Sequence, residues 1–332
     1  MADGTTSVVP KPVWLKRSGP DMQISHVLPN AMYVVRRSIG RTIVEPLRRR
    51  RLARESHVFI HRTIRGYIFK LDPAQSIDEA IFVEGWFEGR FLEFLQGRFE
   101  PGAVALDIGA NIGNNAIHLN RDFAEIHCFE PNPEVFRRLT DNIRSNRLDN
   151  IRLHQAGLGD CDDTLMFREN LAGDLGVSGV VEDDQPLAHS RILHLPVFEA
   201  SKLVNQLGIT RIDFIKIDLE GFKLRVLKGL RATIAVKRPI VSFKFHGHLA
   251  GPEDFGKLTA CLPDYQFYDL EHAPASASTL EKLKWNFRHG GAPVLKRFDR
   301  PEARTYENIL AFPSPEVFSR FTNRPPAPPS SA

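Results

Sequence analysis

Two acidic residues end neighbouring apolar runs in the stretch ALDIGANIGNNAIHLNRDFAEIHCFEPNP, residues 105–133. Asp107 ends the first run and is followed by a glycine-rich turn, and Glu130 ends the second run, 23 positions later. In open parallel sheets, ligands bind at the carboxyl ends of the strands, where an acid after the second strand accepts hydrogen bonds from ribose hydroxyls. The spacing therefore predicts a site for a ligand that contains a ribose.

The turn after Asp107 reads D-x-G-x-N-x-G, with Gly109, Asn111 and Gly113 at the fixed positions. The dinucleotide fingerprint G-x-G-x-x-G has no acid at the place of Asp107, where a carboxylate would repel a pyrophosphate but not an ammonium or a sulfonium. A ribose joined to a cationic, phosphate-free tail describes S-adenosylmethionine (SAM). Either acid alone is equally well explained as a helix N-cap or a surface carboxylate, but the two in register favour a ligand site.

Strand-like apolar runs alternate with helix-like segments from residue 103 onward. Such alternation with short connections predicts crossover units and a mostly parallel sheet. The predicted strands are Val104–Ile108, Ile126–Phe129, Ile151–His154, Ile212–Ile217, Ile240–Phe245 and Phe267–Leu270, and the predicted helices are 113–121, 133–147, 199–207, 222–235 and 252–261. The run YENILAF, residues 306–312, has no helix after it and suits a closing antiparallel strand.

The chain before residue 100 is predicted to extend this domain. Apolar residues at spacings of three and four predict an amphipathic helix within residues 26–54, and residues 57–72 read as a strand pair with a turn near Gly66. Two helical pieces are expected in residues 76–99. We therefore divide the chain into a flexible segment 1–25, an N-terminal extension 26–99, a catalytic domain 100–313 and a proline-rich tail 314–332.

The composition is that of a globular protein, with 42% hydrophobic and 25% charged residues among 332. No run approaches the ~18 apolar residues that a membrane-spanning helix needs, and we see no secretory signal. Cys128, Cys161 and Cys261 form neither a C-x-x-C pair nor a zinc-ligand spacing. Idle thiols in a reducing compartment, the cytoplasm, are therefore expected.

Positive charge is concentrated in RRSIGRTIVEPLRRRRLAR, residues 36–54, which holds eight arginines and one acid, Glu45. The whole chain has a formal net charge of only +4, so the remainder is slightly acidic. Such a segment is either a solvated surface helix or a contact for an anionic membrane or another polyanion, and it is compatible with a peripheral place at the inner membrane surface. It lacks the interleaved aromatics that single-stranded nucleic acid favours, so no nucleic-acid partner is expected.

Four motifs resemble those of the FkbM family of SAM-dependent methyltransferases: LDIGANIG (106–113), FEPNP (129–133), AGLGD (156–160) and FIKIDLEGFKLRVLKGL (214–230). The resemblance covers about residues 100 to 312. It implies a Rossmann-like α/β methyltransferase fold: a mostly parallel sheet with a final antiparallel strand, helices on both faces, and here an N-terminal helical and hairpin extension. It also implies O-methylation of a sugar, glycan or small-metabolite hydroxyl, with S-adenosyl-L-methionine as cofactor.

By position, the resemblance implies cofactor-binding roles for Asp107, Gly109, Asn111 and Gly113 at the methionine moiety, Glu130 and Asn132 at the ribose, and Asp160 at the adenine amino group. Asp218, at the end of the fourth strand, would lie near the sulfonium and the acceptor. Lys216, two residues earlier, is expected to pair with an acid and to have a structural role.

Two positions depart from the family pattern. Lys223 in EGFK and Lys244 in VSFKFHGH stand where the family usually has acids. If these side chains face the substrate, the reversed charge favours an anionic acceptor. If they face away, nothing functional follows, and a third reading is that methyl transfer has been lost while SAM binding remains.

Transfer to a hydroxyl needs alignment of acceptor and sulfonium, together with a general base. The candidates lie at the ends of the fourth and fifth strands: Asp218, Glu220 and His246, with His248 a weaker one. Asp218, Glu220 and His246 would also suit a divalent metal, but the cations of Lys223 and Lys244 oppose one, so no metal is expected.

The main alternative is a non-catalytic SAM-binding or scaffold module, attached through its basic arm to a membrane surface or an assembly. A nucleic-acid methyltransferase is a weaker reading. Base-flipping chemistry of the N-P-P-Y type is not present in the sequence, and FEPNP stands at the second strand. The sequence leaves the acceptor and the oligomeric state open.

Overall fold

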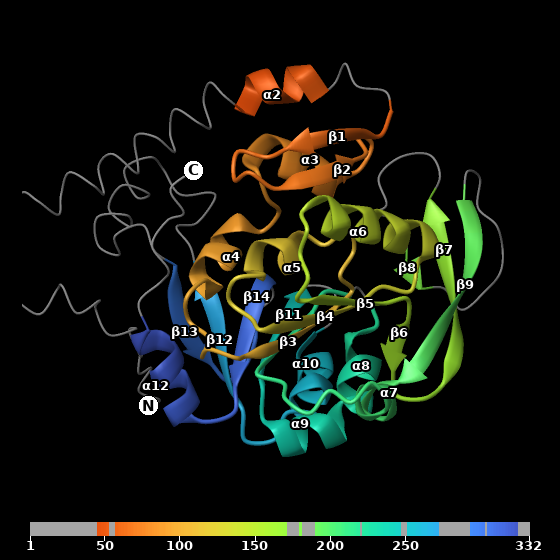
Figure 1. The fold of residues 1–332 in the computed structure, drawn as a ribbon. Coiled ribbons are helices and arrows are strands. Elements are labelled where there is room, and N and C mark those ends of the chain that lie inside the picture. The colour runs from red at the N-terminus through yellow and green to blue at the C-terminus, as the bar shows by residue number, and fades with distance from the viewer. Residues whose placement is uncertain are drawn as a thin grey trace, which may run out of the picture.

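In the part of the chain that the computed structural model describes, the largest unit is an eight-stranded sheet with the order β13-β12-β14-β11-β10-β3-β4-β5 (Figure 1). The structure describes residues 45–52, 57–170, 179–180, 190–219, 221–246, 251–271, 293–302 and 304–324. The strands of this sheet are β3 (Val104–Ile108), β4 (Glu125–Phe129), β5 (Ile151–His154), β10 (Phe214–Ile217), β11 (Ile240–His246), β12 (Gln266–Glu271), β13 (Val294–Phe298) and β14 (Thr305–Phe312).

The strands from β5 across to β11 are parallel, and β14 runs antiparallel to both β11 and β12. The chain builds β4 and β5 on one side of β3 and then crosses to build β10 and β11 on the other side. The point between β3 and β10 is therefore the topological switch point, where doubly wound sheets bind ligands. The predicted Rossmann-like α/β fold, with its closing antiparallel strand at residues 306–312, is confirmed.

Helices cover both faces of this sheet (Figure 1). On one face, here called the first face, lie α4 (Gly89–Leu95), α5 (Asn114–Leu119) and α6 (Pro133–Ser145), and on the other lie α7 (Ala200–Gln206), α8 (Lys223–Gly229), α9 (Arg231–Lys237) and α10 (Gly251–Thr259). Each face has its own hydrophobic cluster, because successive side chains of a strand point to opposite sides. Phe214 of β10 packs in the first-face cluster, for example, and Ile215 packs in the other.

The predicted helix 222–235 is divided into α8 and α9, which meet at Leu230. Gly229 ends α8 where the helix touches the short strand β6 (Gly157–Gly159). A Cβ at this position would lie 1.8 Å from the carbonyl oxygen of Gly159, so the contact requires glycine. The close approach positions α8 beside the segment that carries Asp160.

The N-terminal extension packs over α5 and α6 on the first face (Figure 1). Its described elements are α2 (Glu45–Leu52), β1 (Phe59–Arg62), β2 (Ile68–Leu71) and α3 (Ser76–Glu84), followed by α4. The predicted strand pair is confirmed, with its turn at Gly66. Side-chain amides of α6 pair with the open edge of β2: Asn142 Oδ1 accepts from the Lys70 amide at 2.7 Å, and Asn146 Oδ1 accepts from the Ile68 amide at 2.8 Å.

A buried ion pair between Arg138 of α6 and Asp78 of α3 adds to this contact. The extension and the α/β domain therefore share one core. The rest of the predicted helix in residues 26–54 lies outside the described residues.

A four-stranded sheet in the order β6-β9-β7-β8 was not predicted. Its strands are β6 (Gly157–Gly159), β7 (Asp163–Asn170), β8 (Gly179–Val180) and β9 (Ser190–Glu199). Much of β9 is exposed or only partly buried, so its sequence lacks the continuous apolar run that reveals a buried strand. The pairing of β7 with β9 places residues from far along the chain beside the end of β4, as described below.

The predicted tail 314–332 needs a correction, because its first part is a folded helix, α12 (Pro315–Asn323). Ser314 caps the helix through its side chain, and Pro315 occupies the first turn, where its missing N–H costs nothing. Phe321 of this helix is 3% exposed and packs against aromatic rings, including that of Phe99. The expectation that no helix follows residues 306–312 is therefore wrong, because Pro315 marks a helix start.

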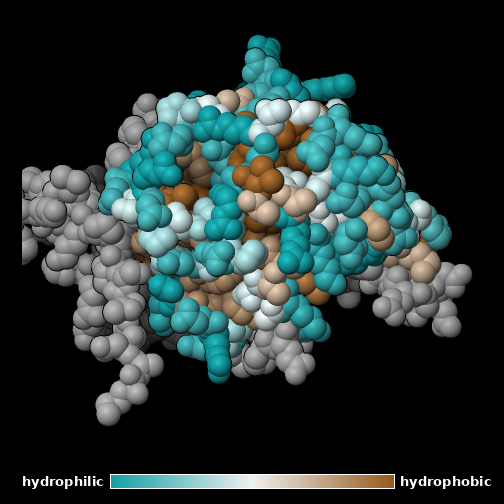
Figure 2. Space-filling model, turned by 90° about the horizontal axis from the view of Figure 1, so that it is seen from below, coloured by the Kyte–Doolittle hydropathy of each residue, from teal (hydrophilic) through white to brown (hydrophobic). Residues whose placement is uncertain are grey.

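Exposed apolar side chains are unevenly distributed over the described residues. The large exposed ones are Leu47, Val58, Ile60, Ile64, Phe198, Leu207 and Val236, and the first four belong to the N-terminal extension. The face seen from below in Figure 2 is mostly hydrophilic toward its edge, with apolar residues nearer its middle. None of the helices that the structure describes has the length and apolarity needed to cross a bilayer.

Candidate functional site

The turn after β3 lies between the ends of β4 and β10, at the switch point of the sheet. The backbone amides of Gly109 and Ala110 donate hydrogen bonds to the carbonyl oxygen of Phe129, at 3.0 and 3.1 Å. Gly109 has a φ of +82°, and a Cβ there would lie 2.6 Å from the carbonyl oxygen of Asp218, so only glycine fits. The predicted loop is therefore packed against both neighbouring strand ends.

Asn111 and Gly113 complete this turn. Both have left-handed backbone conformations, with φ values of 50° and 93°. Gly113 is the N-cap residue of α5, and a Cβ there would lie 2.8 Å from Cδ1 of Leu139. The loop thus directs backbone amides toward the ends of β3 and β4, and the amide of Asn111 donates to Glu130.

Glu130 fastens the loop to the end of β4. Its Oε2 accepts a hydrogen bond from the Asn111 amide at 3.1 Å, and its Oε1 accepts one from the Asn132 amide at 2.9 Å. Burial raises the pKa of Glu130 to about 7, although these two hydrogen bonds oppose the shift. Each carboxylate oxygen has a second lone pair. Glu130 therefore holds the loop and can still accept hydrogen bonds from ribose hydroxyls.

The side chains of the other two predicted cofactor residues have protein partners. Asn132 caps α6 through its Oδ1, and its Nδ2 donates to Glu169 of β7 at 3.1 Å. Asp160 accepts a hydrogen bond from Nε of Arg225 at 2.6 Å. Asn132 therefore acts on the site mainly through its backbone amide, and Asp160 would share its carboxylate between Arg225 and a ligand.

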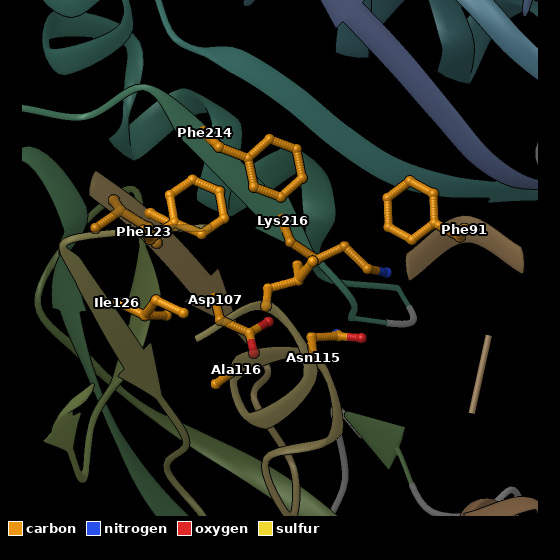
Figure 3. A pocket seen from close by; sticks show the side chains of 11 residues that line it. Phe91, Asp107, Asn115, Ala116, Phe123, Ile126, Phe214 and Lys216 are labelled. Carbon is orange, nitrogen blue, oxygen red and sulfur yellow. The ribbon is translucent and has the colours of Figure 1, made fainter. Parts of the chain in front are cut away.

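A group of charged side chains lies beside the loop on the first face of the sheet. Asp107 of β3 is the register partner of Lys216 of β10. The Lys216 ammonium lies 3.0 Å from Oδ2 of Asp218 and 3.2 Å from Oε2 of Glu88. Figure 3 shows the Lys216 side chain reaching toward Phe91 of α4, with the Asp107 carboxylate beside the start of α5. We call Glu88, Asp107, Lys216 and Asp218 the charge cluster.

Burial and mutual attraction set the ionisation of the charge cluster. Burial raises the pKa of Asp107 to about 6, against the charge of Lys216. Burial also raises the pKa of Glu88. Burial alone would raise the pKa of Asp218, but Lys216 holds it below the usual value, and the two carboxylates nearest to Lys216 in turn keep its pKa high despite burial. The predicted pairing of Lys216 with an acid is confirmed.

The charge cluster has more carboxylates than cations. The donors that the described residues offer to Glu88 and Asp107 are few: Lys216 pairs with Glu88, and the side chain of Asn115 favours the charged form of Asp107 by hydrogen bonding, which lowers its pKa. Buried carboxylates without donors are costly unless a ligand brings donors or positive charge. The residues present therefore fit a cationic ligand that can donate hydrogen bonds.

Lys223 of α8 and Lys244 of β11 lie at the rim of the charge cluster. After Lys216, their charges contribute to the lowered pKa of Asp218. Lys223 donates to the carbonyl oxygen of Leu219 at 2.7 Å, and Lys244 lies 3.5 Å from Glu307, which is itself exposed. Positive charge therefore faces Asp218 from two further elements.

The remaining predicted catalytic residues are less well placed. His246 ends β11, with its Nδ1 3.2 Å from Oγ1 of Thr305, a partner on β14. Glu220 and His248 lie outside the described residues. Nowhere in the described chain do three or more His, Cys, Asp or Glu side chains form a group suited to a metal ion.

A cavity of about 10 Å³ lies beneath the charge cluster, between Asp107, Lys216 and the rings of Phe91, Phe123 and Phe214 (Figure 3). This volume is at the lower limit for one water molecule. The cavity is therefore too small for a nucleoside. A larger hollow of about 280 Å³ lies near the amino ends of β3 and β4, away from the predicted site residues.

Glu88 was missed by the sequence analysis. It stands in EGWFEG between two predicted helical pieces, where no periodicity marks it. Its backbone is left-handed, with a φ of 53°, and this bend turns the side chain toward Lys216, which is distant in sequence. The only available signal was the unpaired Lys216 on a buried strand, which required a partner but did not identify it.

Comparison with known proteins agrees with this geometry. Residues 107–268 match the family described as the methyltransferase FkbM domain. The chain contains an FkbM methyltransferase domain. The match begins at Asp107 and includes Glu130, Asp160, Lys216 and Asp218, so both the glycine loop and most of the charge cluster belong to it.

Among the curated relatives of this FkbM domain is the 31-O-demethyl-FK506 methyltransferase FkbM of Streptomyces tacrolimicus, 32% identical over 157 residues, or 39% of this chain and 60% of that protein. Another is the hexuronic acid methyltransferase AglP of Haloferax volcanii, 28% identical over 132 residues, or 40% of this chain and 51% of that protein. The chain thus spans about half to three fifths of the length of these relatives. A solved FkbM methyltransferase from Methylobacillus flagellatus is 18% identical, with a TM-score of 0.42, over 70% of this chain and 52% of that one.

Proposed function

We propose that the protein is a SAM-dependent methyltransferase that methylates a hydroxyl group of a sugar, a glycan or a small metabolite. The observation that carries the proposal is the charge cluster beside the glycine loop, in which a single buried lysine faces three carboxylates. SAM would supply a methyl group on a positively charged sulfur, and its amino acid tail carries an ammonium group. The FkbM domain supports the same reaction.

The proposed cofactor contacts follow from the strand ends. Asp107 and the loop residues Gly109, Asn111 and Gly113 would enclose the methionine moiety, Glu130 would accept from the ribose, and Asp160 would receive the adenine amino group. Asn132 would support Glu130 through its amide. We further propose residues 100–313 as the catalytic domain, with residues 26–99 as its extension.

The proposed general base is among Asp218, Glu220 and His246. Asp218 is the best supported, because its side chain is 28% exposed while that of its partner Lys216 is buried. Its carboxylate can therefore contact Lys216 and a substrate at the same time. The base would take the proton of the acceptor hydroxyl as the oxygen attacks the methyl group. Lys216 would hold the Asp218 carboxylate in place.

The acceptor is proposed to be anionic. Lys223 and Lys244 present positive charge to Asp218 from α8 and β11, and an acidic substituent near the reacting hydroxyl would pair with them. The name of the Haloferax volcanii relative gives hexuronic acid as its substrate. A sugar acid is therefore the first acceptor class to examine.

Transfer of labelled methyl from SAM to a set of acceptors tests this function. We expect label to appear in a hexuronic acid such as glucuronic acid, faster than in neutral glucose, with one S-adenosylhomocysteine (SAH) formed per methyl transferred. The anionic preference is wrong if glucose is methylated equally fast. If SAM binds but no acceptor is methylated, the non-catalytic SAM-binding module becomes the better description.

We also propose that the N-terminal extension contacts an anionic membrane surface. The helix α2 exposes Arg49, Arg50 and Arg51, and Ile60 of the neighbouring hairpin is 75% exposed. A bilayer interface accommodates both cations and aliphatic side chains, whereas nucleic acid would use only the cations. Together with the free cysteines Cys128, Cys161 and Cys261, this favours a cytoplasmic site at the inner membrane surface.

Sedimentation of the full chain with vesicles tests this contact. Binding is expected with phosphatidylserine-containing vesicles and not with pure phosphatidylcholine. Ile60→Asp should weaken it about tenfold, whereas Val236→Asp should not, although Val236 is also 75% exposed. Val236 lies on α9, at the far side of the molecule from β1 (Figure 1). Equal loss in both variants, or binding to duplex DNA in place of vesicles, would remove the proposal.

A further inference from the structure

Glu88 enters the charge cluster from outside the FkbM domain. It precedes α4 in the N-terminal extension, and its side chain is 7% exposed. Its φ of 53° is uncommon for a residue with a side chain, and such conformations persist where the surroundings enforce them, often at functional sites. The backbone is thus held in a bend that delivers a carboxylate to Lys216 of β10.

Glu88 approaches the cluster at Lys216 of β10. Burial raises the pKa of Glu88, and the charges of Lys216, Asp218 and Lys244 also act on it. Glu88 and Asp218 therefore flank the Lys216 ammonium together, at 3.2 and 3.0 Å. Asp107 lies one strand away, beside the loop.

Charge is unbalanced at this point of the site. Lys216 compensates one carboxylate of the three in the cluster, and the rim cation Lys244 is 3.5 Å from another acid, Glu307. In the described structure, the Glu88 carboxylate contacts the Lys216 ammonium, which it shares with Asp218. A positive charge supplied by the ligand would satisfy Glu88 and Asp218 at the end of β10.

We propose that Glu88 is a further ligand-binding residue, which contacts the cationic sulfur centre of SAM and makes the site prefer SAM to SAH. The inference rests on the proposed function, because it takes SAM as the ligand and Asp218 as the neighbour of its sulfur. Loss of the methyl group turns the sulfonium into a neutral thioether. The carboxylates around Lys216 would then lose the positive charge that the ligand adds to that of Lys216, and the product would be held less tightly than the substrate.

Calorimetric titration of the full chain with SAM and with SAH tests this preference. We expect Glu88→Gln to weaken SAM binding by about tenfold or more, as for the loss of one charge-assisted contact, and to change SAH binding by less than about threefold. Glu84→Gln is the matched control, since Glu84 is an exposed acid four residues earlier in the chain. It should leave both affinities unchanged.

A second variant separates ligand binding from backbone strain. Glycine adopts positive φ without cost, so Glu88→Gly removes the carboxylate and relaxes the bend. We expect it to fold and to show the same selective loss of SAM binding. Equal losses of SAM and SAH in both variants, or no loss in either, would overturn the inference. If the wild type binds neither ligand, the proposed function itself is wrong, and the two failures are thereby distinguished.

Discussion

Replacing Glu130 with alanine is expected to weaken SAM binding by about 100-fold or more. The substitution removes two acceptors for the ribose, and it also leaves the amides of Asn111 and Asn132 without their partner. Each lost hydrogen bond to a charged group is worth about 1.5–3 kcal/mol, so two account for this loss. Calorimetry or equilibrium dialysis with labelled SAM measures the effect.

Two comparisons make the Glu130 result specific. The first is Glu134→Ala. The side chain of Glu134, in the first turn of α6, is 59% exposed, and its removal should change the Kd for SAM by less than about twofold. The second is Glu130→Gln, which keeps one side-chain oxygen that can accept from one of the two backbone amides, and it should retain part of the affinity for SAM. If Glu130→Ala binds SAM as tightly as the wild type, the assignment of the ribose to the end of β4 is wrong.

Replacing Lys216 with methionine is expected to lower the free energy of unfolding by about 3–5 kcal/mol, measured by chemical denaturation at pH 8. Removing one partner of a buried ion pair leaves the other charge uncompensated, which is costly in this range. Lys216 is 2% exposed and has two carboxylates within 3.2 Å, so its loss leaves both without their nearest counter-charge. The matched control is Lys244→Met, since Lys244 is 20% exposed and has one exposed partner at 3.5 Å. It should cost less than about 1 kcal/mol.

The decrease in the free energy of unfolding caused by Lys216→Met should become smaller as the pH falls. Without Lys216, burial leaves Glu88 and Asp218 with pKa values raised above those of the unfolded chain. The folded variant then holds protons that the unfolded chain releases, so its stability decreases as the pH rises through those values. Comparing variant and wild type at pH 8 and pH 5 should therefore show the smaller difference at pH 5. A difference that is equal at both pH values, or one that Lys244→Met reproduces, would mean that Lys216 does not hold these carboxylates.

Local patterns in the sequence were sufficient to predict seven of the eight strands of the large sheet, and β13 was missed. Parallel strands buried on both faces are nearly continuous apolar runs, so β3, β4 and β10 were visible in the sequence. The charged residues that interrupt these runs at their carboxyl ends, Asp107 and Asp218, marked the site. The glycines that follow Asp107, such as Gly109, indicated the ligand-binding loop after β3.

Features that depend on distant contacts could not be predicted in this way. Glu88 reaches Lys216 only because α4 packs over β10, and no local pattern encodes that approach. Asn132 was assigned to the ribose, but β7 brings Glu169 to its side chain. Helix α12 lies within the residues predicted to be a tail, and its burial depends on rings such as that of Phe99. In each case tertiary contact decided the role of the residue.

The most direct test of the central claim is a calorimetric titration of the wild-type chain with SAM, SAH and ATP. The account requires a ribose acceptor at Glu130 and a cation-binding charge cluster at Asp107. We therefore predict that SAM and SAH bind in the micromolar range and that ATP, which has the ribose but carries phosphates, does not bind. No heat with SAM up to millimolar concentration, or binding of ATP as tight as that of SAM, would contradict the account.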